Sequence, residues 1–285
     1  MKIAVTTESG HLGSAIIRQL VRDLGASNVI GIARTPENAK HQQVEIRNGD
    51  YNNRDDFEKA LDDIDSILLV SGMDKPENRI RQHRNVIDAA KACKVKKIVY
   101  TSIIGDPVRT AFSPIVKSNR QTEEDIMNSG LHWVIGRNGL YIEPDLEYID
   151  NYANEGAIKN SAGNGKCAYT SRNELAYAYS QMLRNDKHHS KIYNLAGEPV
   201  QQAELCNAIN DVFGTNIVYE EIPVDIFTKN RQNELGDFLG TIVGGIYEGI
   251  KTGAFDVPSG FEKAAGRLHQ SLREMVKNFK HLNES

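Results

Sequence analysis

Short apolar runs alternate with amphipathic segments along the first half of the chain. Runs rich in β-branched residues occur at 3–6, 29–33, 44–46, 67–70, 95–102 and 133–135. Between them, apolar residues recur at helical spacing over 12–24, 57–64, 86–93 and 119–129. A strand, a helix and a further strand connected in this way form a right-handed crossover with parallel strands. The pattern therefore predicts an α/β fold with a doubly wound parallel sheet covered by helices on both faces.

The second half has a less regular pattern. It predicts a helix at 173–183, a strand at 192–195, a helix at 203–213 and a strand at 217–222. Glycines in 236–253 indicate helices joined by tight turns, and 261–279 is predicted as one closing amphipathic helix. We expect a dinucleotide-type domain of residues 1–140, to which 166–197 returns. A smaller C-terminal α/β lobe would contain 141–165 and 198–285.

Composition narrows the class of protein. Of 285 residues, 40% are hydrophobic and 25% charged, which is typical of a folded globular chain. Lys and Arg number 34 against 38 Asp and Glu, so the net charge of −4 argues against a nucleic-acid partner. The three cysteines cannot all pair within one chain and show no Cys-x-x-Cys spacing. A reduced intracellular compartment is therefore expected.

Membrane insertion and metal binding are not expected. No apolar run reaches the roughly 18 residues that span a bilayer. Glu8 interrupts the apolar N-terminal run where a signal peptide would continue, so we expect a cytoplasmic protein. His188 and His189 are adjacent and do not share a helix face, which disfavours a metal site.

The turn between the first strand and the first helix carries two glycines. Gly10 and Gly13 lie in the segment Thr6-Thr7-Glu8-Ser9-Gly10-His11-Leu12-Gly13. Gly10 would let the backbone approach a pyrophosphate, and Gly13 would let the helix pack closely on the strand. The N–H groups and dipole of a helix N-terminus attract phosphate. This segment therefore predicts a dinucleotide phosphate site; the alternative is a turn that merely needs glycine.

A single arginine favours one dinucleotide. Arg34 follows the second predicted strand, where a dinucleotide fold contacts the adenosine ribose. An acidic residue there binds the 2′-hydroxyl of NAD, whereas an arginine can pair with the 2′-phosphate of NADP. Arg34 therefore predicts NADPH (NADP) as the cofactor, and a solvated surface arginine is the alternative.

A series of motifs carries a resemblance to a known family. It comprises SGHLG at 9–13, IARTP at 32–36, GDY at 49–51, QHRNVIDAA at 82–90, YTS at 100–102, TE at 122–123, RNGLY at 137–141, AGNG at 162–165, TSRNELA at 170–176 and YNLAG at 193–197. In order and spacing these motifs resemble the NmrA-like branch of the atypical short-chain dehydrogenase/reductases. Within that branch, the chain is most similar to the quinone and triphenylmethane reductases.

The resemblance implies an NADPH-binding Rossmann domain, with a small C-terminal lobe over the nicotinamide end. The implied cofactor contacts are Thr6, Ser9, Gly10, His11, Leu12, Gly13, Arg34, Ser71, Gly72 and Asn138. The implied substrate contacts are Ser102, Asn138 and Tyr141, together with the lobe. Tyr141 could stack on a flat aromatic acceptor, although a core aromatic is equally compatible with its position. The expected partners are an aromatic or quinone small molecule and a second copy of the chain in a homodimer.

The phosphate loop departs from the family pattern. The family loop reads Gly-Ala-Thr-Gly-x-x-Gly, and Thr7-Glu8-Ser9 replaces Gly-Ala-Thr here. Thr7 is β-branched and tolerates a tight turn less well than glycine does. Glu8 brings a carboxylate close to the expected pyrophosphate, which weakens binding unless the side chain points away.

The sequence does not identify a proton donor. Many short-chain dehydrogenases use Tyr-x-x-x-Lys, but the match at 247–251 lies far past the predicted sheet, and we interpret it as chance. Relatives often carry a basic residue where Asn119 stands, and Lys117 is two residues from that place. Lys117 and Tyr141 are therefore weak catalytic candidates. The arginines around His83, at 79, 81 and 84, are interpreted as a solvated helix face, or else as a partner or phosphate site.

One main function and two alternatives follow. Hydride from NADPH would pass to a quinone or a similar flat, electron-poor acceptor, whose oxygen can take its proton from water. The alternative is a non-catalytic, NADP(H)-responsive regulatory or binding protein of the NmrA type. The altered loop and the missing proton relay are the reasons to consider it. A sugar-nucleotide epimerase is the third possibility, and the absence of a well-placed Tyr-x-x-x-Lys argues against it.

Overall fold

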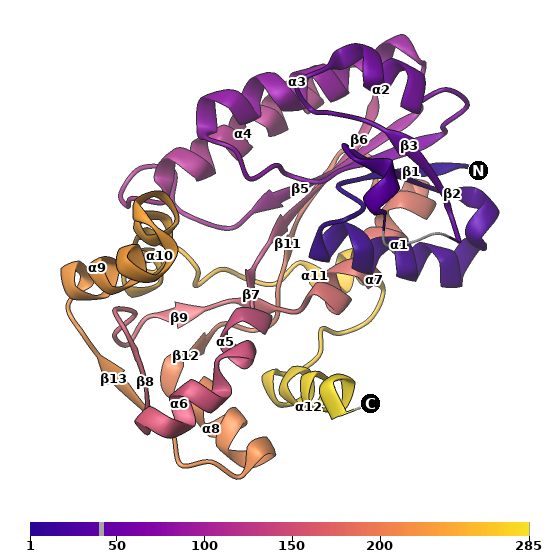
Figure 1. Ribbon diagram of the computed structural model, residues 1–285. Helices are drawn as coiled ribbons and strands as arrows, with labels where there is room; N and C mark the ends of the chain where they lie inside the picture. The colour runs from indigo at the N-terminus through magenta and orange to yellow at the C-terminus, as the bar shows by residue number, and fades with distance from the viewer. Residues whose placement is uncertain (40–42, 285) are drawn as a thin grey trace.

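The computed structural model describes residues 1–39 and 43–284. A seven-stranded sheet with the order β11-β6-β5-β4-β1-β2-β3 forms the centre of the larger part (Figure 1). Its strands are β1 (Ile3–Thr6), β2 (Val29–Ala33), β3 (Glu45–Asn48), β4 (Ser66–Leu69), β5 (Lys97–Ile103), β6 (His132–Asn138) and β11 (Lys191–Leu195). Every strand pairing in this sheet is parallel, which confirms the predicted doubly wound fold.

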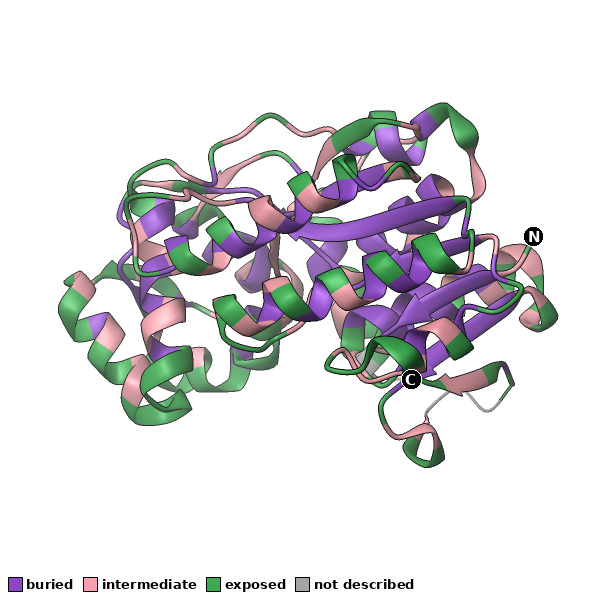
Figure 2. Ribbon diagram, turned by 90° about the horizontal axis from the view of Figure 1, so that it is seen from above, coloured by how far each residue is buried: buried purple, intermediate pink, exposed green. Residues whose placement is uncertain are grey.

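Helices cover both faces of the sheet. On one face α1 (His11–Leu24) packs against α7 (Arg172–Arg184); on the other lie α2 (Arg54–Ala60), α3 (Pro76–Ala92) and α4 (Ser113–Met127) (Figure 1). Short 3-10 helices occur at η1 (Ala26–Asn28), η2 (Pro36–Asn38) and η3 (Asp186–His188). The central strands are buried and the outer helix faces are exposed (Figure 2). The continuous apolar runs in the sequence correspond to strands buried on both faces.

The smaller part contains three two-stranded sheets: β10-β7, β12-β9 and β13-β8. These strands are β7 (Leu140–Tyr141), β8 (Ala157–Asn160), β9 (Lys166–Cys167), β10 (Tyr169–Thr170), β12 (Val200–Gln201) and β13 (Val218–Glu221). The helices are α5 (Glu143–Glu147), α6 (Ile149–Glu155), α8 (Gln202–Phe213), α9 (Val224–Leu235), α10 (Asp237–Lys251) and α12 (Leu272–Glu284). Helices α9 and α10 form a hairpin at one end of the molecule (Figure 1).

Several predicted helices differ from the structure. Helix α3 begins at Pro76, ahead of the predicted start at 86, and α10 runs unbroken from Asp237 to Lys251, where helices joined by tight turns are predicted. The predicted closing helix at 261–279 is wrong, because α11 (Phe261–Ala265) ends at Gly266 and α12 starts only at Leu272. Gly266 adopts φ 75°, a left-handed conformation that terminates a helix. Helix α4 begins at Ser113, ahead of the predicted start at 119, with a proline in its first turn.

The chain crosses between the two parts more than once. Strand β11 pairs with β6 and α7 packs on α1, so both return to the larger part, whereas β9 and β10 pair with strands of the smaller part. Helix α11 also packs on α7 and β11, which places Phe261 in the core of the larger part. The division into residues 1–140 with 166–197 and residues 141–165 with 198–285 stays a prediction. None of the described helices is both long enough and apolar enough to cross a membrane.

Candidate functional site

One cavity of about 1440 Å³ connects the carboxyl ends of the central strands with the α9–α10 hairpin. Every predicted cofactor and substrate residue lines it: Thr6, Ser9, Gly10, His11, Leu12, Gly13, Arg34, Ser71, Gly72, Ser102, Asn138 and Tyr141. Lys117, by contrast, is exposed on α4 and does not belong to the lining. The structure thus brings the predicted residues together, while their individual roles stay predictions.

The phosphate loop has the features that a dinucleotide needs. Helix α1 begins directly after Gly10, and its first turn has neither a side-chain cap nor an acidic residue. The amides at this helix end are therefore available to an anion. A Cβ added at Gly13 would lie 2.3 Å from the carbonyl oxygen of Thr7, so only glycine permits this close packing. The residues present fit the pyrophosphate of a dinucleotide.

The two departures in this loop have different consequences. Thr7 adopts φ 55°, a left-handed conformation that is unfavourable for a β-branched residue. Glu8 is fully buried and does not line the cavity. A Cβ added at Gly31 of β2 would lie 2.9 Å from Cγ of Glu8, so this side chain packs behind the loop. The expected repulsion between Glu8 and the pyrophosphate therefore does not arise from this conformation.

Two further cofactor candidates differ in how available their side chains are. Arg34 follows β2, is exposed and lines the cavity, as a 2′-phosphate ligand must. Thr6 is buried, and its Oγ1 donates to the carbonyl of Leu68 at 3.2 Å and accepts the N–H of Val70 at 2.9 Å. The Thr6 hydroxyl therefore joins β1 to β4.

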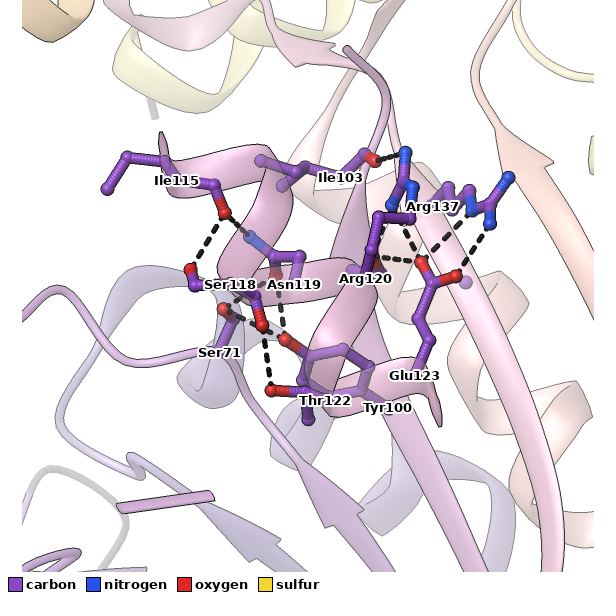
Figure 3. Close-up of polar contacts among 12 residues, drawn as sticks. Ser71, Tyr100, Ile103, Ile115, Ser118, Asn119, Arg120, Thr122, Glu123 and Arg137 are labelled. Atoms are coloured by element: carbon purple, nitrogen blue, oxygen red, sulfur yellow. Dashed lines mark hydrogen bonds and ion pairs between the residues drawn. The ribbon is translucent and has the colours of Figure 1, made fainter. Parts of the chain in front are cut away.

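On the acceptor side, Ser102 belongs to a charged cluster around Glu123. Figure 3 shows Glu123 between Arg120 and Arg137 of this cluster. The buried Ser102 hydroxyl donates to Oε1 of Glu123 at 2.5 Å and accepts from Nη1 of Arg120 at 3.1 Å. Glu123 also pairs with Arg120 at 2.7 Å and with Arg137 at 2.6 Å. The cluster joins α4 to β5 and β6. The Ser102 hydroxyl is therefore committed to fixing the strand end rather than free to react.

Asn138 and Tyr141 form a second polar contact on the acceptor side. Nδ2 of Asn138 donates to the hydroxyl of Tyr141 at 3.2 Å, and Oδ1 accepts from the Tyr179 hydroxyl at 2.6 Å. The guanidinium of Arg172 lies 5.9 Å from the centre of the Tyr141 ring. Burial raises the pKa of the Tyr141 hydroxyl. These contacts orient Tyr141 at the cavity wall.

The interpretation of His83 and its three neighbouring arginines as a solvated helix face is wrong for Arg79 and for His83. Arg79 is 3% exposed and His83 is fully buried, whereas Arg81 and Arg84 are exposed. Helix α3 packs against α2 and α4, so the side of α3 that carries Arg79 and His83 faces the protein interior. Both residues share helical spacing with the buried Val86. That spacing was the available signal in the sequence.

His83 is held as a neutral ring by its surroundings. Its Nε2 accepts the N–H of Gly72 at 3.1 Å, and Nδ1 lies 2.9 Å from Oγ1 of Thr122. Burial first, and the charge of Arg79 second, lower the pKa of His83 to about 3. The ring therefore fixes the backbone after β4 without carrying charge.

A second buried group that the sequence did not reveal is Asp145 on α5. Asp145 is 6% exposed and lines the cavity. Its carboxylate accepts hydrogen bonds from the hydroxyls of Tyr169 at 3.1 Å and of Tyr152 and Tyr247 at 3.3 Å. Burial raises the pKa of Asp145 to about 6. Tyr247 thus faces Asp145, while Lys251 pairs with an exposed glutamate of β13, so the two do not act together.

In comparisons with known proteins, the chain is similar to dinucleotide-dependent reductases. The model of the NAD(P)H-binding family matches residues 9–186. Quinone oxidoreductase 2 of Escherichia coli strain K12 is 29% identical over 99% of both chains. The triphenylmethane reductase of Citrobacter sp., solved in complex with NADP(H), is 30% identical with a TM-score of 0.89. The match covers 97% of this chain and 99% of that one.

A more distant structure shares the fold alone. A nucleoside-diphosphate-sugar epimerase of Staphylococcus aureus is 23% identical with a TM-score of 0.88, over 97% of this chain and 100% of that one. The family model and the 30% identical reductase support a narrower assignment, because each extends over most of the chain. The chain belongs to the NAD(P)H-binding, NmrA-like family.

Proposed function

We propose that the protein is an NADPH-dependent oxidoreductase that reduces a quinone or a similar flat, electron-poor acceptor. The observation that carries the proposal is the single cavity, in which the phosphate loop and Arg34 line one end and Tyr141 and α10 line the other. The similarity to a quinone oxidoreductase and to a triphenylmethane reductase supports the same chemistry.

The side chains divide the work along the cavity. The amides at the start of α1 would hold the pyrophosphate, and Arg34 would pair with the 2′-phosphate. NADPH, when bound, supplies the hydride. Tyr141 would orient the acceptor ring, while apolar residues of α9 and α10 such as Phe227 and Ile246 would exclude water from it. A quinone oxygen can then take its proton from water, so the protein mainly needs to align the two reactants.

Tyr141 remains the better of the two candidate proton donors. It lines the cavity, whereas Lys117 is exposed on the outer side of α4. Tyr141 is partly buried, and desolvation raises the pKa of its hydroxyl, which keeps it protonated at neutral pH, as a donor requires. The proposal also includes a homodimer, testable by sedimentation, and a cytoplasmic location, testable by cell fractionation.

Turnover with purified protein tests the proposed activity. NADPH oxidation is followed at its absorbance maximum with a panel of neutral quinones, and we expect oxidation that depends on the quinone. Binding of NADPH without oxidation across the panel would favour the regulatory, non-catalytic alternative. Failure to bind NADPH at millimolar concentration would overturn both.

A further inference from the structure

Arg79 is a buried cation without an anionic partner. Its Nη2 donates to Oγ of Ser71 and to Oδ1 of Asn119, the latter at 3.3 Å. Its Nε is buried and has no hydrogen-bond partner. Within residues 1–39 and 43–284, no carboxylate pairs with this guanidinium. Arg79 nevertheless belongs to the lining of the cavity, so its charge lies next to whatever the cavity binds there.

Other arginines with buried contacts are compensated. Arg120 and Arg137 share the buried Glu123, and Arg267 pairs with the buried Glu174. A buried charge is stable when a counter-ion and hydrogen bonds compensate its desolvation. Arg79 has hydrogen bonds but no counter-ion. An anion that is present only during binding or reaction would complete this arrangement.

The groups around Arg79 do not supply negative charge. Asn119 is an amide, and it accepts from the Tyr100 hydroxyl at 2.7 Å. Burial raises the pKa of Tyr100, so this hydroxyl stays protonated and neutral. His83 is also neutral, as its lowered pKa shows. Ser71, Tyr100 and Asn119 converge in one polar cluster (Figure 3).

The position of Arg79 separates it from the expected phosphate site. The phosphate loop follows β1, whereas the partners of Arg79 come from the end of β4 and from α4. Strand β4 lies between β1 and β5 in the sheet, so Arg79 lies toward the side that carries Ser102. A dinucleotide that places its pyrophosphate on the β1 loop extends its reacting ring across this part of the sheet.

We propose that Arg79 stabilises the negative charge that hydride transfer delivers to the acceptor, and that it thereby selects neutral carbonyl acceptors over cationic ones. The inference rests on the proposed reductase function and names its substrate class. A fixed cation in a site shielded from water favours the state in which negative charge develops. Asp145, a second buried ionisable group that lines the cavity, already accepts hydrogen bonds from three tyrosine hydroxyls.

The charge balance differs between the two acceptor classes. For a quinone, the C4–H bond of the dihydronicotinamide breaks, and the hydrogen with its two electrons bonds to one quinone oxygen. The other oxygen then becomes an anion, which a proton from water neutralises. For a triarylmethyl cation, the same hydride bonds to the central carbon and yields a neutral product. Only the first reaction creates an anion that Arg79 can stabilise.

Acceptor selectivity in the variant R79M tests the inference. We expect kcat/KM for a neutral quinone to fall about 10- to 100-fold, whereas kcat/KM for a cationic triarylmethane dye is unchanged or rises. The Kd for NADPH should not change. The control R84M removes an exposed arginine of the same helix, paired with Asp125, and should leave the ratio of the two acceptors unchanged. A parallel loss for both acceptors, or a weaker Kd for NADPH that accounts for the loss, would overturn the proposal.

A binding measurement keeps the inference testable without turnover. The phenolate form of 4-nitrophenol resembles the hydroquinone monoanion that hydride transfer produces, and its absorbance reports whether the bound molecule is the phenol or the phenolate. With NADP⁺ present, the native protein should lower the pKa of the bound phenol. R79M should abolish this shift. If R79M does not fold, N119D serves in its place: it puts a carboxylate beside Arg79 and should abolish the shift as well. An equal shift in all three proteins would refute the role of Arg79, whereas a native protein that shifts the phenol but reduces no quinone would refute only the proposed function.

Discussion

The two ends of the cavity are built in different ways. The cofactor end consists of one continuous loop, residues 6–13, together with Arg34 after the next strand. The acceptor end gathers side chains from segments far apart in the sequence, among them Arg79 on α3, Tyr141 on β7, Asp145 on α5 and Tyr247 on α10. The cofactor end presents backbone amides and the exposed Arg34 to the cavity, with the buried Glu8 outside the lining, whereas the buried Arg79 and Asp145 line the acceptor end. Recognition of the cofactor is therefore local, and control of the acceptor depends on the tertiary fold.

The largest expected effect concerns Asp145 at the acceptor end, which should make the free energy of unfolding depend on pH. Burial raises the pKa of Asp145 from 3.8 to about 6, so the folded protein holds this proton more tightly than the unfolded chain does. The stabilisation is complete below pH 4 and is lost as pH rises through about 6. D145N should remove a pH-dependent loss of about 2–3 kcal/mol in the free energy of unfolding between pH 4 and 7.

Denaturant unfolding of the native protein and of D145N at several pH values measures this difference. Carboxylates whose pKa values are lowered, such as Asp106, also make stability depend on pH. Both proteins contain them, so their contribution cancels in the difference between native protein and D145N. E155Q alters an exposed carboxylate that also lines the cavity and serves as a control. Equal pH dependence in native protein and D145N would show that Asp145 is not held in the protonated form by burial.

The next effect concerns the cofactor end. R34A should weaken NADPH binding about 10- to 100-fold and leave NADH binding unchanged, because charge-assisted hydrogen bonds to a phosphate typically contribute about 1.5–3 kcal/mol. R22A alters an exposed arginine on α1 that does not line the cavity, and neither affinity should change in it. The Kd values follow from titration of protein fluorescence. Equal weakening for both dinucleotides would show that Arg34 does not contact the 2′-phosphate.

The same contrast explains what could be predicted from the sequence. The parallel sheet follows from alternating apolar runs, and the phosphate loop from two glycines at a strand-to-helix turn, because both signals are local. Arg79 and His83 were misjudged because the burial of their helix face depends on α2 and α4. Asp145 gave no local signal, since its three tyrosine partners come from α6, β10 and α10. The closing helix was overextended because the helical pattern persisted across Gly266.

The smallest expected effect concerns backbone strain at Thr7 in the phosphate loop. It would weaken the contrast between the two ends, because the cofactor end would then also contain an unfavourable feature. Thr7 holds φ 55° immediately before the buried Glu8, and a β-branched side chain is costly in this conformation. T7G should therefore raise the free energy of unfolding by about 1 kcal/mol, after the greater backbone entropy of an unfolded glycine is taken into account. K94G replaces an unbranched residue at φ 57° and should gain less. Thermal unfolding of both variants measures the gains in stability. A loss of stability in T7G would show that the Thr7 side chain makes a contact that stabilises the fold by more than the strain destabilises it.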